Sequence, residues 1–185
     1  IEKSGKIVIM TTPMVEHGLW TEKEWENTIK YSIENIKKNF EEHEIVIKIH
    51  PVGESKEKYE NLIKKLNISI PILQKENLIS IISNADFIIT YAQSSGVLQA
   101  ACLEKPVIIA NFFKYSLEKM PFIKEKLAIE WKEPKKLKEA ISKTEDPDYQ
   151  KNLKRYISKY LYKFDGKASE RSAKAIIELI KDFQN

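Results

Sequence analysis

The sequence predicts an α/β protein, a three-layer Rossmann-like domain with about six parallel strands and helices on both faces. Short apolar segments alternate with longer amphipathic ones, as expected when each strand is followed by a helix that crosses over to the next strand. Several short segments are apolar almost throughout, which is typical of strands covered on both faces, for example 7–10, 45–49, 87–89 and 107–109. The 185 residues fit one domain, residues 1–185.

Helix-start signals separate the strands and set the order of the elements. Thr21 and Glu24 have the spacing of a capping box, and apolar residues at helical spacing follow them. Pro134 stands where a proline commonly opens a helix. The strands are expected at 6–10, 44–49, 86–90, 106–110 and 127–131, and a further short strand is expected within 68–73. The helices are expected at 21–40, 56–66, 77–84, 96–103, from 134 onward, and near 147–162 and 168–183.

The composition narrows the class of protein. The hydrophobic fraction of 42% and the charged fraction of 31% indicate a globular chain. No apolar stretch reaches the roughly 18 residues of a membrane span, and no secretory signal is recognised, so we expect a cytoplasmic protein. Three histidines and one cysteine form no metal-ligand cluster, and Cys102 lies in an apolar run as a small core residue. We expect no metal site and no resident cofactor.

The net charge is +4, and lysine-rich segments lie near residues 135–138 and 151–159. Two interpretations of these segments stay open. They are either solvated helix faces or a surface that attracts an anionic partner, including the headgroups of a membrane to which the protein binds peripherally. Aromatic residues are not interleaved with them, so nucleic acid is not an expected partner. The glycine patterns of a dinucleotide fold and of a P-loop are missing from the sequence.

Ligands of open parallel sheets bind beyond the carboxyl ends of the strands, so the residues that follow each strand are the candidates. His50 and Pro51 follow the second strand, and an imidazole there can bind phosphate or transfer a proton. The alternative is a surface histidine in a turn. His17 and Gly18 after the first strand, and Asn111 after the fifth, are further candidates for lining the cleft.

A second candidate group opens the helix after the fourth strand. Ser94, Ser95 and Gly96 combine two hydroxyls with main-chain amides at a helix start, which suits a phosphate. Gln99 lies one turn further along the same helix face. The alternative interpretation, an ordinary serine N-cap, explains one serine but not the group.

The His-Pro pair, the Ser-Ser pair and the following Lys105-Pro106 resemble the C-terminal half of GT-B enzymes. The most similar groups are capsule and sialic acid transferases and the CDP-glycerol glycerophosphotransferases. The resemblance implies that His50 contacts the donor phosphate or stabilises the leaving group. It also implies that Ser94, Ser95 and Gly96 bind phosphate and that Gln99 faces the ribose.

The segment 165–171, Asp-Gly-Lys-Ala-Ser-Glu-Arg, resembles a closing element of the non-hydrolysing UDP-N-acetylglucosamine epimerases and of some glycerophosphotransferases, although a plain helix start explains it equally well. Two positions depart from the GT-B pattern. Gln99 replaces a glutamate that would accept from ribose hydroxyls, and Glu104 replaces a glycine common before Lys-Pro.

Together these features predict the nucleotide-activated donor-binding domain of a glycosyl- or glycerophosphotransferase, with a nucleotide-sugar or CDP-alcohol as the donor. The chain begins with Ile1 and is expected to be part of a longer enzyme whose N-terminal GT-B domain is its partner. Two alternatives stay open, a UDP-N-acetylglucosamine epimerase-like domain and a nucleotide-sugar-binding module without catalysis.

Overall fold

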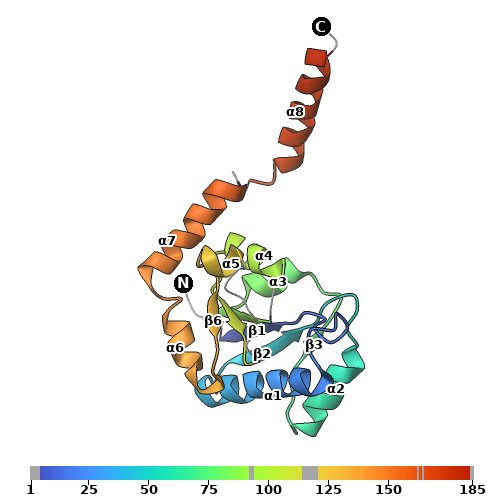
Figure 1. Cartoon of the computed structure of the whole chain (residues 1–185), viewed down its shortest axis with the longest axis vertical. Coiled ribbons are helices and arrows are strands. Elements are labelled where there is room, and N and C mark those ends of the chain that lie inside the picture. Colours follow the sequence, from blue (N-terminus) through green and yellow to red (C-terminus); the bar gives the residue numbers. More distant parts are fainter. Residues whose placement is uncertain (1–4, 92–93, 114–120, 162, 164, 184–185) are drawn as a thin grey trace.

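The computed structural model describes residues 5–91, 94–113, 121–161, 163 and 165–183, and these confirm the three-layer α/β fold (Figure 1). Six strands form one sheet in the order β3-β2-β1-β4-β5-β6, and every neighbouring pair is parallel. The strands are β1 (Lys6–Met10), β2 (Glu44–Lys48), β3 (Ile72–Leu73), β4 (Phe87–Thr90), β5 (Val107–Ala110) and β6 (Ile129–Trp131).

Helices cover both faces of the sheet, as Figure 1 shows. One face carries α1 (Glu22–Asn39), α2 (Lys56–Lys65) and α6 (Leu137–Ser142), the last preceded by the 3-10 turn η1 (Pro134–Lys136). The other face carries α3 (Leu78–Ser83), α4 (Gly96–Cys102), α5 (Pro121–Lys124) and α7 (Pro147–Tyr156). A π-helical turn, η2 (Ile157–Leu161), and α8 (Ala168–Phe183) follow.

Alternation along the central strands builds two separate cores. Ile7 and Ile9 of β1 pack with α1 and α2, whereas Val8 and Met10 pack with the helices of the opposite face. Successive side chains of a strand point to opposite faces, and in a covered parallel sheet both faces must be apolar. This requirement explains the continuous apolar runs of the sequence.

The short strand expected within residues 68–73 is formed as β3. It has two residues because Pro71, which has no N–H group to donate, stands before it, although the Pro71 carbonyl accepts from the amide of Ile47 at 2.9 Å. Two other features differ from the expectations. The short helix α5 was not predicted. Cys102 is half-buried and not a fully buried core residue, and this burial raises the pKa of its thiol.

Two helix ends involve residues that the sequence analysis singled out, the start of α1 and the end of α4. The Thr21–Glu24 capping box is formed in both directions, with Thr21 N donating to Glu24 at 2.7 Å and Glu24 N donating to Thr21 at 3.2 Å. After α4, Glu104 adopts φ of 53°, and the amides of Glu104 and Lys105 donate to the carbonyls of Ala101 and Ala100. This Schellman turn favours glycine, and Glu104 occupies it with a left-handed backbone.

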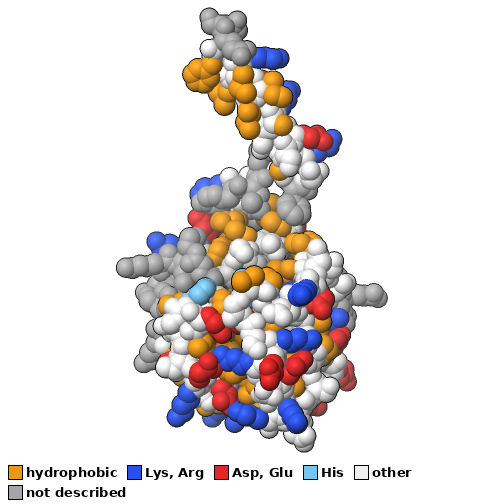
Figure 2. Space-filling model, turned by 90° about the vertical axis from the view of Figure 1, so that its right-hand side faces the viewer, with side chains coloured by type: hydrophobic (Ala, Val, Ile, Leu, Met, Phe, Trp, Pro, Cys, Tyr) orange, Lys and Arg blue, Asp and Glu red, His pale blue; other side chains and the backbone are white. Residues whose placement is uncertain are grey.

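The C-terminal helix α8 extends away from the sheet (Figure 1), and none of its described residues is buried. Its apolar side chains gather along the helix in Figure 2, with Ile176, Ile177, Leu179, Ile180 and Phe183 each more than half exposed. No helix in the described ranges has the length and apolarity needed to cross a membrane. Peripheral membrane association stays a prediction.

Candidate functional site

The carboxyl ends of β2, β1 and β4 lie side by side, since β1 pairs with β2 on one side and with β4 on the other. Neighbouring strands are about 4.8 Å apart, so the ends of β2 and β4 are separated by roughly 10 Å. His50 follows β2, and Ser94 and Ser95 follow β4. The predicted imidazole and hydroxyls therefore lie at the same edge of the sheet, on the two sides of the loop that follows β1.

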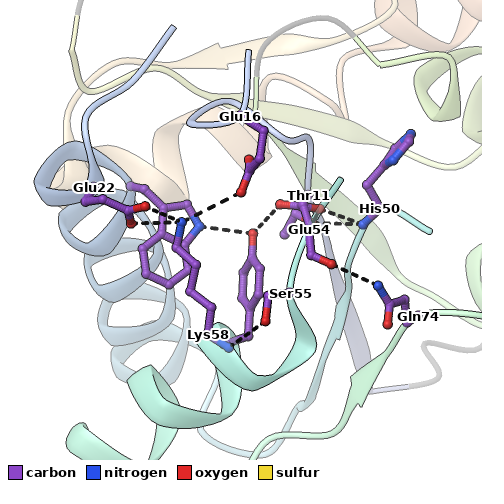
Figure 3. Close-up of polar contacts among 10 residues, drawn as sticks. Thr11, Glu16, Glu22, His50, Glu54, Ser55, Lys58 and Gln74 are labelled. Carbon is purple, nitrogen blue, oxygen red and sulfur yellow. Dashed lines mark hydrogen bonds and ion pairs between the residues drawn. The ribbon is translucent and has the colours of Figure 1, made fainter. Parts of the chain in front are cut away.

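His50 is exposed, and its imidazole points away from the buried side chains around it (Figure 3). The ring Nδ1 lies 2.5 Å from the carbonyl oxygen of Val52 and 3.3 Å from the Val52 amide nitrogen. Nδ1 therefore contacts both main-chain groups of Val52, donating to the carbonyl when it carries the proton and accepting from the amide when it does not. This leaves Nε2 to face a ligand, and in the imidazolium form it can donate to an anionic oxygen.

At the start of α4 only one of the two serines makes a capping hydrogen bond. Ser95 occupies the N-cap position with helical backbone angles, is exposed, and makes no side-chain capping hydrogen bond. The Ser94 hydroxyl instead accepts from the amide of Gly96 at 3.2 Å. The capping interpretation therefore does not account for Ser95, and its hydroxyl is presented at the edge of the sheet.

Gly96 allows α4 to begin directly beside the end of β1. A Cβ atom at this position would lie 2.6 Å from Cε of Met10, the last residue of β1, and closer still to its sulfur. Met10 is only 3% exposed and cannot move freely into solvent. The missing side chain of Gly96 therefore sets the distance between the helix start and the loop after β1.

Gln99 lies on α4 one turn after Ser95, as expected, and is half-buried. Its Oε1 atom is buried and has no hydrogen-bond partner within the described residues. A contact with a ribose hydroxyl would use Nε2 or require the side chain to rotate. The ribose role of Gln99 stays a prediction.

The three remaining candidates lie in different surroundings. His17 and Gly18 belong to an exposed turn after β1, in which Gly18 has φ of 68°. Asn111 is 7% exposed, and its side-chain amide donates to Glu130 of β6 at 2.7 Å. Asn111 therefore links the ends of two strands, while the exposure of His17 and Gly18 leaves them accessible to a ligand.

A residue that the sequence analysis missed, Glu54, lies beneath the His50 loop and is 8% exposed. Its Oε2 atom accepts from the main-chain amide of His50 at 2.6 Å and from the hydroxyl of Thr11 at 2.5 Å. Its Oε1 atom accepts from the hydroxyl of Tyr59 at 2.5 Å. A glutamate in a polar turn gives no periodic signal, so only its burial distinguishes it from the many solvated glutamates of this chain.

A buried lysine supports the same region from β2. The Lys48 ammonium donates to the carbonyls of Ile49 at 3.0 Å and Gln74 at 2.7 Å, and Gln74 in turn donates to the carbonyl of Glu54 at 3.0 Å. Burial lowers the pKa of Lys48, while the nearby carboxylates of Glu76 and Glu54 act in the opposite direction. These bonds tie the loop after β3 to the loop after β2.

The Asp165–Arg171 segment forms the start of α8. The Asp165 carboxylate accepts both from Arg171, at 2.8 and 2.9 Å, and from the amide of Lys167 at 3.0 Å. The hydrogen bond with Arg171 lowers the pKa of Asp165. This arrangement is that of an exposed helix start, and its resemblance to an epimerase element stays a prediction.

No protein-family model and no curated protein matches the sequence. Solved structures do resemble this fold. A Listeria monocytogenes protein named as a UDP-N-acetylglucosamine 2-epimerase has a TM-score of 0.61 and 17% identity, covering 96% of this chain and 46% of its own. The wall teichoic acid polymerase TagF, in a structure with CDPG, has a TM-score of 0.56 and 18% identity, covering 97% of this chain and 42% of its own.

A third structure, the UDP-GlcNAc 2-epimerase from Neisseria meningitidis bound to UDP-GlcNAc, has a TM-score of 0.54 and 17% identity. It covers 80% of this chain, which corresponds to 38% of its own length. The chain thus spans less than half the length of the proteins it resembles. At these identities the likeness establishes the fold alone, which is the Rossmann-like α/β fold of a GT-B half-domain.

Proposed function

We propose that this chain binds the nucleotide-activated donor of a glycosyl- or glycerophosphotransferase that acts in polysaccharide or glycoconjugate synthesis. The observation that carries the proposal is the position of His50 and the Ser94–Ser95 pair at one edge of the sheet, on the two sides of β1. The structural neighbours that hold UDP-GlcNAc and CDPG support the same class of ligand. The donor is a nucleotide-sugar or a CDP-alcohol.

The proposed chemistry is stabilisation of the negative charge that grows on the departing phosphate. His50 donates from Nε2, and the hydroxyls of Ser94 and Ser95 donate from the other side of the loop that follows β1. Gly96 brings the start of α4 close to that loop. The proposal requires neither a metal ion nor a resident cofactor.

The acceptor and its general base belong, in this proposal, to an N-terminal GT-B domain that acts as the partner of this chain. This chain covers 46% and 42% of the length of the first two structures described. The remainder of those proteins is long enough to contain such a domain. The exposed apolar side chains of α8 offer it a contact surface. The chain alone is therefore expected to bind donor and to show little or no transferase activity.

Calorimetric titration tests the donor site directly. Wild-type chain and His50→Ala are titrated with CMP, CDP, UDP, UDP-sugars and CDP-glycerol. A lost hydrogen bond to a charged phosphate costs about 1.5–3 kcal/mol, so His50→Ala should weaken nucleotide binding at least about tenfold. Replacing Ser94 and Ser95 together by alanine should weaken it as well.

His43→Ala is the matched control, because His43 precedes β2 at the opposite edge of the sheet, where it pairs with Asp86 at 3.4 Å. This variant should bind nucleotide as the wild type does. The donor-site assignment is wrong if none of the nucleotides binds the wild type even at millimolar concentration, or if His43→Ala weakens binding as much as His50→Ala.

A second candidate function is epimerisation of UDP-N-acetylglucosamine. It is favoured by the two structural neighbours named as epimerases and by the 165–171 segment. An epimerase exchanges the proton at the sugar carbon whose configuration it inverts, whereas a transferase does not. Incorporation of deuterium from D₂O into UDP-N-acetylglucosamine, measured with the chain joined to its N-terminal partner domain, separates the two activities.

The third candidate is a nucleotide-sugar-binding module without catalysis. The glutamine at position 99, whose Oε1 atom is buried, favours it because a charged acceptor for the ribose is missing there. Binding of nucleotide without turnover, in the protein that also contains the partner domain, would support this function.

A further inference from the structure

We propose that Glu54 is a positioning residue, a buried carboxylate that holds the main chain of His50 in place and thereby sets where the imidazole meets the donor phosphate. The inference rests on the proposed donor site and adds to it a residue that does not touch the ligand. Figure 3 shows the Glu54 carboxylate between the ends of β1 and β2, with the His50 ring pointing away from it.

The first observation is that Glu54 joins the two strand ends that flank the site. Its Oε2 atom accepts from the Thr11 hydroxyl, which follows β1, and from the His50 amide, which follows β2. The His50 amide also lies 3.3 Å from the Thr11 hydroxyl oxygen. Glu54 and Thr11 together therefore hold the main chain at His50, the residue proposed to bind the phosphate.

The second observation is that Glu54 is itself fixed from the helix side. The Tyr59 hydroxyl of α2 donates to Oε1 at 2.5 Å, and the Trp25 indole of α1 donates to the Tyr59 oxygen at 3.0 Å. The Trp25 and Tyr59 rings pack edge to face with centroids 5.0 Å apart. The carboxylate thus has a rigid support, which a residue that positions another side chain needs.

The third observation concerns the backbone that brings Glu54 inward. Gly53 adopts φ of 89° and lies against Pro13 of the loop after β1, with its missing Cβ 3.5 Å from the Pro13 Cβ. This turn lets the chain fold back so that Glu54, four residues after His50, reaches the His50 amide. Glu54 then points beneath the loop while His50 points out of it.

The residue type also matters. A carboxylate has only hydrogen-bond acceptors, so it can accept from all three donors, Thr11, His50 and Tyr59. A buried charge needs such hydrogen bonds to offset the loss of water. A glutamine has one acceptor oxygen and one donor nitrogen, so at least one donor would lose its acceptor. Hydrogen bonds to an ionised group are roughly twice as strong as neutral ones. We therefore expect a graded loss from glutamate to glutamine to alanine.

The test compares wild type, Glu54→Gln and Glu54→Ala by two site-specific readouts. Amide hydrogen exchange of His50, followed by NMR in the free protein, needs no ligand. Calorimetry with CDP and UDP measures affinity. In Glu54→Ala, exchange of the His50 amide should accelerate at least about tenfold and the affinity should fall at least about fivefold, with Glu54→Gln in between.

Tyr149→Phe serves as a control for general destabilisation, because it removes a buried hydroxyl on the opposite face of the sheet. This variant should leave the affinity within about twofold of the wild type, and it should accelerate exchange of the His50 amide no more than that of the other slowly exchanging amides. If Glu54→Ala accelerates all slowly exchanging amides equally, or retains wild-type affinity, Glu54 does not position His50. If the wild type binds no nucleotide, the proposed function fails instead, while the exchange of the His50 amide still reports on the hydrogen bond.

Discussion

Replacing Gly96 by alanine would place a Cβ atom 2.6 Å from Cε of Met10 and closer still to its sulfur. The thioether must retreat by about 1 Å to restore an ordinary contact of 3.5–4.0 Å. Met10 is 3% exposed, so this movement repacks the core, at a cost of about 1–3 kcal/mol. Gly96 is the first residue of α4, where alanine gains less over glycine than the roughly 0.5–1 kcal/mol of a helix interior. We expect a net loss of about 1 kcal/mol in the free energy of unfolding.

Urea denaturation of a double-mutant cycle measures this effect. In a Met10→Ala background the methyl group introduced by Gly96→Ala enters the space that the thioether leaves, so this substitution should be neutral or stabilising there. The two substitutions should therefore be coupled by at least about 1 kcal/mol. Additive effects, or a gain of stability from Gly96→Ala in the wild type, would refute the reasoning.

Four further predictions concern stability and are all measured by chemical denaturation. Glu104→Gly should stabilise by about 0.5–1 kcal/mol because it removes the cost of a left-handed backbone, while Asn67→Gly at the equivalent turn after α2 should change little. Tyr149→Phe should cost about 1–3 kcal/mol at neutral pH, since it leaves a buried amide without its acceptor. Burial raises the pKa of Tyr149 to about 12, so the unfolded chain loses this proton near pH 10 and the folded chain near 12. Stability should thus fall across pH 10–12, less steeply in Tyr149→Phe, and equal slopes would contradict this assignment. Thr21→Ala should cost about 1 kcal/mol through the lost capping box, and a change below about 0.2 kcal/mol would show that the box is not formed. Deleting residues 165–185 should leave the free energy of unfolding of the sheet domain unchanged within about 0.5 kcal/mol, because none of the described residues of α8 is buried. A larger loss would mean that α8 packs on the sheet.

The order of elements could be predicted because it depends on local patterns. Apolar runs at β1, β2, β4 and β5 and the Thr21 capping box are signals within a few residues of one another. A short strand within residues 68–73 could be predicted for the same reason, but only the pairing with β2 decides at which residue its ladder begins. The position of His50 and Ser94–Ser95 at one edge could be predicted for the same reason, since parallel strands deliver their carboxyl ends to one side.

The sequence by itself therefore determined the fold class and the edge of the sheet where a ligand is expected, because hydrophobic periodicity and strand direction are local properties of the chain. Only the tertiary structure decided which polar residues are buried and what they contact. Glu54 accepts hydrogen bonds from Thr11 after β1, His50 after β2 and Tyr59 of α2. Asn111 donates a hydrogen bond to Glu130 of the neighbouring strand β6. Such contacts depend on how strands and helices pack in three dimensions, and the burial of a single polar side chain leaves no periodic trace in the sequence.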